Sequence, residues 1–106
     1  MIHYSYMVID TRSLFQADLS ELFDLLSSCG YEGVELNLFP GLAAESSRLE
    51  QALAASGLTL PSFLTGAAYS DGLCLSSADS GARQAAVAYL KDCIELAGRF
   101  QSILVV

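Results

Sequence analysis

Apolar residues fall into four short runs, each with the composition of a β-strand. The runs are rich in aromatic and β-branched side chains, which favour extended backbone. They cover residues 2–9 (IHYSYMVI), residues 33–39 (GVELNLF), residues 58–64 (LTLPSFL) and the final SILVV. Pro61 weakens the centre of the third run, because proline donates no hydrogen bond to a sheet.

Helical periodicity lies between these runs. The first helical stretch begins after Asp18, a capping residue, and ends at Gly30. The second covers about residues 43–56, and the third begins near Asp79 or Ser80. The side chains expected to face the sheet are Leu19, Leu22, Phe23 and Leu26; Leu49, Ala52, Leu53 and Ser56; and Ala86, Tyr89, Leu90, Cys93, Ile94 and Ala97.

The order of the elements, β-α-β-α-β-α-β, predicts an α/β fold with four parallel strands and three helices. A doubly wound nucleotide fold would need a glycine-rich loop after the first strand, but Asp10-Thr11-Arg12-Ser13 follows instead. This favours part of a (β/α)8 TIM barrel, which needs roughly 250 residues. The chain stops within an apolar strand, so we expect residues 1–106 to be the amino-terminal half of such a barrel.

Composition narrows the classes of partner. The 106 residues are 53% apolar, as a chain with a packed core requires, and carry a formal net charge of -7 with only five Lys and Arg. That balance argues against binding to nucleic acid or to an anionic membrane. There is no basic leader or long apolar run, and the three cysteines lack C-x-x-C spacing. We therefore expect a cytoplasmic protein with reduced, mostly buried thiols.

Polar residues interrupt the second strand. Glu35 and Asn37 alternate with apolar residues, so they are expected to point into the barrel, toward the mouth where barrel active sites lie. A polar layer that binds nothing is the alternative. Tyr6 is the better site candidate of the two tyrosines that share a face of the first strand, the other being Tyr4. His3, at the start of that strand, is expected to be structural.

The stretch 65–78 is rich in Gly, Ser and Ala and is predicted to be a long loop after the third strand. Within it, Tyr69 is a candidate for contact with a ligand, whereas Asp71 and Gly72 form a turn signal. No metal-ligand spacing and no Ser-His-Asp set is found, so no metal site is predicted within these residues.

Three segments resemble the xylose-isomerase-like TIM-barrel family, in the order expected for its amino-terminal half. Residues 30–36 (GYEGVEL) are similar to the turn and second strand of that family. Residues 49–60 (LEQALAASGLTL) are similar to its second helix and third strand, and residues 86–106 (AVAYLKDCIELAGRFQSILVV) to its third helix and fourth strand. The chain departs from the family at Gln101, where a glycine is usual, and in the third-strand segment, which lacks the endonuclease branch's histidine.

The resemblance implies a sugar or sugar-phosphate isomerase or epimerase. The family's isomerases hold a divalent metal (Mn, Co, Mg or Zn) with residues of strands five to eight, so catalytic groups and metal ligands would lie outside these 106 positions. Within the chain, Tyr6, Glu35, Gly66 and Tyr69 stand where the epimerase branch lines its substrate pocket. The implied reaction is proton transfer through an enediolate.

Other functions remain open at this point. A dehydratase or an endonuclease IV-like enzyme of the same superfamily is the alternative reaction, although the acidic charge suits a DNA enzyme poorly. A half-barrel that is not catalytic and pairs with itself is the alternative class. The isolated 106-residue chain is expected to be inactive, to bind no metal, and to self-associate through its uncovered sheet.

Overall fold

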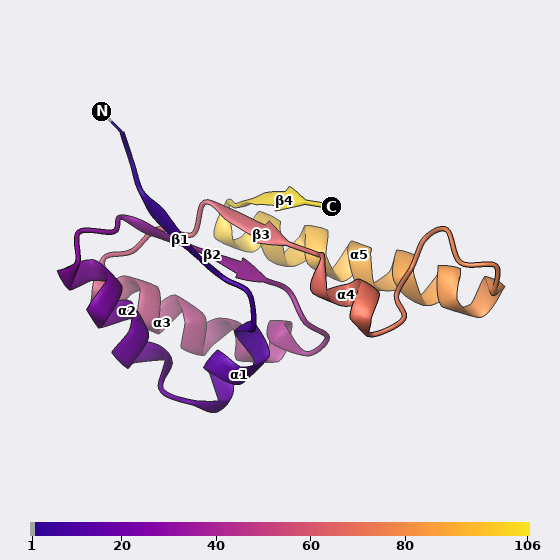
Figure 1. Ribbon diagram of the computed structural model, residues 1–106, viewed down its shortest axis with the longest axis horizontal. Helices are drawn as coiled ribbons and strands as arrows, with labels where there is room; N and C mark the ends of the chain where they lie inside the picture. Colours follow the sequence, from indigo (N-terminus) through magenta and orange to yellow (C-terminus); the bar gives the residue numbers. More distant parts are fainter. Residues whose placement is uncertain (1) are drawn as a thin grey trace.

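Four strands form one parallel sheet in the computed structural model, which describes residues 2–106 (Figure 1). Their order in the sheet equals their order in the chain: β1 (Ser5–Val8), β2 (Gly33–Asn37), β3 (Ser62–Leu64) and β4 (Ile103–Val105). The predicted α/β class and the four parallel strands are confirmed. The third strand is shorter than expected, since regular pairing starts only after Pro61 and the preceding residues contribute a single bridge from Thr59 to Gly33.

The predicted helices are present, and shorter ones accompany them. The helical elements are α1 (Thr11–Gln16), α2 (Leu19–Ser28), the 3-10 helix η1 (Leu42–Glu45), α3 (Ser46–Ser56), α4 (Ala67–Ser70) and α5 (Ser80–Phe100). The three expected helices correspond to α2, to η1 with α3, and to α5. Helix α1 replaces the loop expected after the first strand, and α4 lies within the loop expected over 65–78. Both are too short for an apolar repeat to reveal them.

Capping residues fix where the long helices begin and end. Asp18 accepts hydrogen bonds from the backbone N–H groups of Ser20 and Glu21, at 3.0 and 3.2 Å, and Asp79 caps α5 in the same way. Gly57 ends α3 with a φ of 73°, in the left-handed region that glycine favours. The predicted helix starts at Asp18 and Asp79 are therefore confirmed.

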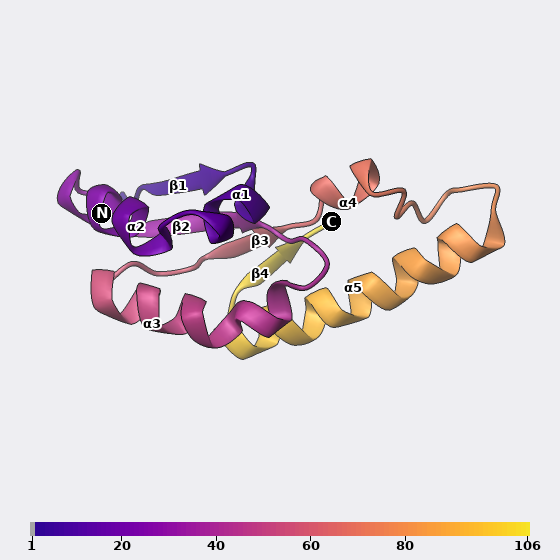
Figure 2. The ribbon, with the colours of Figure 1, turned by 90° about the horizontal axis from the view of Figure 1, so that it is seen from below.

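Helices α2, α3 and α5 cover the same face of the sheet (Figures 1 and 2). Crossovers between parallel strands are right-handed, so strands added in one direction place all their helices on one side. Val34, Leu36 and Leu38 point toward those helices and are at most 1% exposed. The most enclosed members of the core behind them include Phe23, Phe63 and Leu49.

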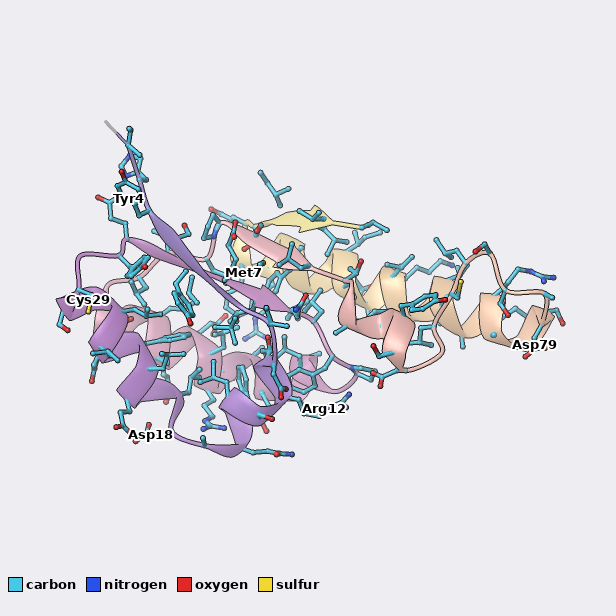
Figure 3. The ribbon with its side chains drawn as sticks, viewed as in Figure 1. Tyr4, Met7, Arg12, Asp18, Cys29 and Asp79 are labelled. Atoms are coloured by element: carbon cyan, nitrogen blue, oxygen red, sulfur yellow. The ribbon has the colours of Figure 1, made fainter. Side chains whose placement is uncertain are left out.

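The other face of the sheet, here called the open face, carries no helix of the described residues. Met7 of β1 and Ile103 and Val105 of β4 are 48%, 70% and 46% exposed. Figure 3 shows Met7 on this face. The sheet therefore has one packed face and one face that is apolar at its two edges and polar along β2.

Two expectations about burial are wrong. Ile94 was expected to face the sheet but is 61% exposed, because the buried stripe of α5 passes through Cys93, Leu96 and Ala97 instead. The cysteines were expected to be mostly buried, yet Cys29 is exposed and only Cys93 is buried, all three being free thiols. Among residues 2–106, no helix combines the length and the apolar character that crossing a bilayer requires.

Candidate functional site

A pocket of about 160 Å³ lies where β1 and β2 end and α1 begins. Its lining includes Asp10, Arg12, Asn37, Phe39, Ser70 and Asp71, and we call it the carboxyl-edge pocket. Ligands of parallel α/β proteins bind beyond the carboxyl ends of the strands, because loops and helix starts meet there. The position of the pocket makes it the candidate functional site.

An ion pair closes one side of the carboxyl-edge pocket. Arg12 Nη2 donates a hydrogen bond to Asp71 Oδ2 over 3.2 Å, which joins the first turn of α1 to the end of α4. The guanidinium carbon of Arg12 also lies 5.5 Å from the centre of the Phe39 ring, a cation–π arrangement. Figure 3 shows Arg12 at the start of α1. The ring and the carboxylate together hold the cation at the pocket.

Asp10 adds a second carboxylate and caps α1. One of its oxygens accepts a hydrogen bond from Ser13 N at 3.1 Å and the other from Ser13 Oγ at 2.7 Å. These bonds, first the one from the Ser13 hydroxyl, lower the pKa of Asp10 below its ordinary value. The Asp10 carboxylate therefore keeps its negative charge at lower pH than an ordinary aspartate does.

Asn37 is the one predicted site residue that lines the pocket. It is the last residue of β2, and its Nδ2 donates a hydrogen bond to the carbonyl oxygen of Ile9 at 2.8 Å. That bond ties the end of β2 to the end of β1. Because an amide carries both donors and an acceptor, Asn37 is suited to bind a hydroxyl group of a ligand.

Glu35 lies on the open face, two residues before Asn37. Its Oε1 accepts a hydrogen bond from Ser62 Oγ at 2.9 Å, and both side chains are partly buried. The predicted orientation of Glu35 and Asn37, away from the helices, agrees with the structure. Glu35 itself does not line the carboxyl-edge pocket.

Tyr6 does not join these residues. In the parallel register Tyr6 pairs with Val34 and Met7 pairs with Glu35, so Tyr6 lies on the helix-covered face. Its ring packs edge-on against Tyr31, with 5.7 Å between ring centres. Tyr6 was predicted to lie near Glu35, but the residue of β1 that pairs with Glu35 is Met7.

The other candidates lie near the pocket or at the opposite edge. Gly66 is exposed and precedes α4, while Tyr69 on α4 is 75% exposed; neither lines the pocket, although Ser70 does. His3 contacts Glu32 at the amino-terminal edge of the sheet, away from the site.

The described residues do not fit the divalent metal that the resemblance implies. In residues 2–106 no three His, Cys, Asp or Glu side chains converge in a way that would hold an ion. The carboxylates of the pocket are held instead by hydrogen bonds from Ser13 and Arg12.

The set of groups in the pocket is suited to binding a polyhydroxylated molecule. Two carboxylates accept hydrogen bonds, the guanidinium donates them, and the amide does both. Sequence reasoning noted Asp10, Arg12 and Asp71 but gave them no role in a site. Asp10 and Arg12 follow the first strand and Asp71 lies in the segment after the third, and this was the available signal, because residues that follow the strands of a parallel sheet meet at one of its edges.

The chain matches no protein-family model and none of the curated proteins. The resemblance to the xylose-isomerase-like family therefore stays a prediction that depends on the motifs in the sequence.

Proposed function

We propose that this chain is the amino-terminal part of a (β/α)8 barrel of the xylose-isomerase-like kind, and that its carboxyl-edge pocket binds a sugar or sugar phosphate. The whole barrel would be an isomerase or epimerase that moves a proton through an enediolate. The residues of this chain would bind and orient hydroxyl groups, whereas the groups that move the proton would belong to the rest of the barrel. The chain alone would show no turnover.

The strand order supports the barrel. A doubly wound sheet reverses direction at a switch point and places helices on both faces. Here the order β1-β2-β3-β4 does not reverse, and the helices share one face (Figure 2). In a barrel the open face would become the interior. The partly buried pair of Glu35 and Ser62 would then belong to the interior layers of side chains.

The single observation that carries the sugar-binding proposal is the meeting of Arg12, Asp71 and Asn37 at the carboxyl-edge pocket. The pocket's volume of about 160 Å³ lies below the roughly 300–1,000 Å³ of typical ligand sites, so it accommodates one end of a sugar. Two carboxylates face one guanidinium, and this balance favours neutral sugar hydroxyls over a phosphate group. We therefore expect the phosphate of a sugar phosphate to lie outside this pocket.

Titration of the isotope-labelled chain with D-fructose and with D-fructose 6-phosphate, followed by amide NMR, tests the proposal. The expected result is a set of shifts at Asp10, Arg12, Asn37 and Asp71, with a Kd for fructose on the order of 1–10 mM. Asn37→Ala should abolish the shifts. Lys91→Ala, an exposed change on α5 outside the pocket, should leave them unchanged. Shifts absent at these sites, or unaffected by Asn37→Ala, would contradict the proposal.

The open face favours a second candidate function, a half-barrel that pairs with itself. Met7, Ile103 and Val105 expose apolar surface along both edge strands of the sheet. Exposed apolar side chains beside unpaired strand edges are typical of an interface. A second copy would cover it without any catalytic role for the chain.

A further inference from the structure

An apolar cavity lies on the helix-covered side, between the segment that follows β2 and helix α5. Its volume is about 280 Å³, and we call it the α5 cavity. Leu38, Leu42, Leu73, Tyr89, Asp92 and Cys93 are among the residues that line it. Leu38 and Phe39 also line the carboxyl-edge pocket, so the two sites lie on either side of one short segment.

One of the residues that line the α5 cavity, Tyr89, carries a buried polar atom without a partner. Tyr89 is only 9% exposed, and its hydroxyl makes no hydrogen bond with any described residue. A buried hydroxyl without a partner costs about 1–3 kcal/mol, and native structures contain few of them. Burial is the main reason why the pKa of Tyr89 is raised, so the hydroxyl keeps its proton.

The lining defines which ligand fits. Most of it is aliphatic or aromatic, which favours an apolar body. Asp92 is the single carboxylate among the lining residues, and no Lys or Arg accompanies it, so an anion is disfavoured. The unpaired Tyr89 hydroxyl requires an acceptor on the ligand.

We propose that the α5 cavity binds a small neutral molecule with an apolar body and one hydrogen-bond acceptor, of which an aryl ketone is the simplest example. The acceptor accepts a hydrogen bond from the Tyr89 hydroxyl, and the body packs against Leu38, Leu42 and Leu73. The hydroxyl is covered in the free chain, so the side chains around it must move slightly for this bond to form. This site is separate from the proposed sugar site and does not depend on it.

Binding of acetophenone and of ethylbenzene to the 106-residue chain, measured by saturation-transfer NMR, tests the inference. The two probes share one carbon skeleton and differ in the carbonyl oxygen. Tyr89→Phe should weaken acetophenone binding about 3–10-fold, the range expected for one hydrogen bond, and leave ethylbenzene within about twofold. Because this change removes an unpaired hydroxyl, it should keep or raise the melting temperature.

A second variant locates the probe independently. Ala43 lies on the cavity rim and is exposed, so Ala43→Phe should fill the entrance without disturbing the core, and weaken both probes. Lys91→Ala on the same helix as Tyr89 should change neither. The inference is wrong if acetophenone does not bind, if Ala43→Phe leaves binding unchanged, or if Tyr89→Phe affects both probes equally.

Discussion

Arg12 Nη2 and Asp71 Oδ2 lie 3.2 Å apart although 59 positions separate the two residues in the chain. The contact joins the first turn of α1 to the end of α4, so it determines the shape of the carboxyl-edge pocket. Both side chains are well exposed, at 50% for Arg12 and 37% for Asp71. Pairs of this kind contribute about 0–1 kcal/mol to stability, and therefore the geometry of the pocket is what the contact chiefly affects.

Arg12→Ala and Asp71→Asn, alone and together, should separate binding from stability. Each change should weaken D-fructose binding about tenfold, because Arg12→Ala removes a donor of the pocket and Asp71→Asn removes the charge that holds Arg12 in place. The free energy of unfolding should fall by less than about 1 kcal/mol. Amide NMR and urea unfolding measure the two effects. A large loss of stability with unchanged sugar binding would make the pair structural.

The Asp10 carboxylate should make the stability of α1 depend on pH. Its pKa is lower in the folded chain than in the unfolded one, so the folded state binds fewer protons. The stabilisation is therefore present above the unfolded value of about 3.9 and is lost as the pH falls through the lower folded value. Amide exchange of α1, measured from neutral pH downward, should show this loss.

Asp10→Asn provides the matching variant. Asparagine caps helices about as well as aspartate but does not titrate, so the acid-induced part of the change should disappear while α1 is retained. Asp24→Asn changes an exposed carboxylate on α2 and should leave the α1 profile as it is. Identical pH profiles for the native chain and Asp10→Asn would show that the hydrogen bonds from Ser13 to the Asp10 carboxylate do not cause the pH dependence of α1.

Some features of the fold could be predicted from the sequence and others could not, for physical reasons. The helix starts at Asp18 and Asp79 were predictable, because a capping side chain and a long apolar stripe act within a few residues of each other. The alternation of polar and apolar residues around Glu35 likewise predicted which face of the sheet carries its side chain. The family resemblance predicted that Tyr6 and Glu35 line the same pocket. The register between β1 and β2, which depends on both strands, places Tyr6 on the opposite face of the sheet from Glu35.

The carboxyl-edge pocket was the less predictable part. Two short helices, α1 and α4, position Asp10, Arg12 and Asp71. Arg12 and Asp71 are 59 positions apart in the sequence, and neither helix is long enough to have a periodic pattern of its own. Their meeting depends on the packing of the whole sheet. Local patterns alone therefore identified Asn37 but not the groups around it.

Gly33 should be required for space rather than for backbone freedom. A Cβ built there would lie 2.8 Å from Ser5 Oγ and 2.9 Å from Thr59 Oγ1, on the open face where three strands approach. Gly33→Ala should lower the free energy of unfolding by about 1–3 kcal/mol, as expected for overpacking. Urea unfolding measures the loss.

Two further variants make the Gly33 result specific. Adding Ser5→Ala to Gly33→Ala removes the nearest clashing atom and should restore part of the stability. Gly66→Ala meets nothing within 4 Å and should change stability by no more than about 0.5 kcal/mol. Equal losses for the two glycine variants would mean that the contacts around Gly33 are not the cause.

Gln101 ends α5 in the left-handed region with a φ of 54°, where glycine is more favourable. This is the position at which the chain departs from the family pattern. Gln101→Gly should raise the free energy of unfolding by about 0.5–1 kcal/mol, after the greater freedom of glycine in the unfolded chain is deducted. Gly57→Ala, at the equivalent end of α3, should lower it by a similar amount. Thermal unfolding checks both signs, and a destabilised Gln101→Gly would contradict the prediction.

The purified 106-residue chain should form dimers or larger species, because its open face exposes apolar side chains beside two unpaired strand edges. Ile103→Lys places a charge on that face and should shift the population toward monomer in light scattering. Ile94→Lys is the matched control: the residue is exposed to a similar degree, but it lies on α5, which packs against the other face of the sheet. Both variants change the net charge equally, so a difference between them reports the position of the interface rather than charge. A native chain that stays monomeric at high concentration and unfolds cooperatively would contradict self-association, and equal effects of the two lysines would place the contact elsewhere.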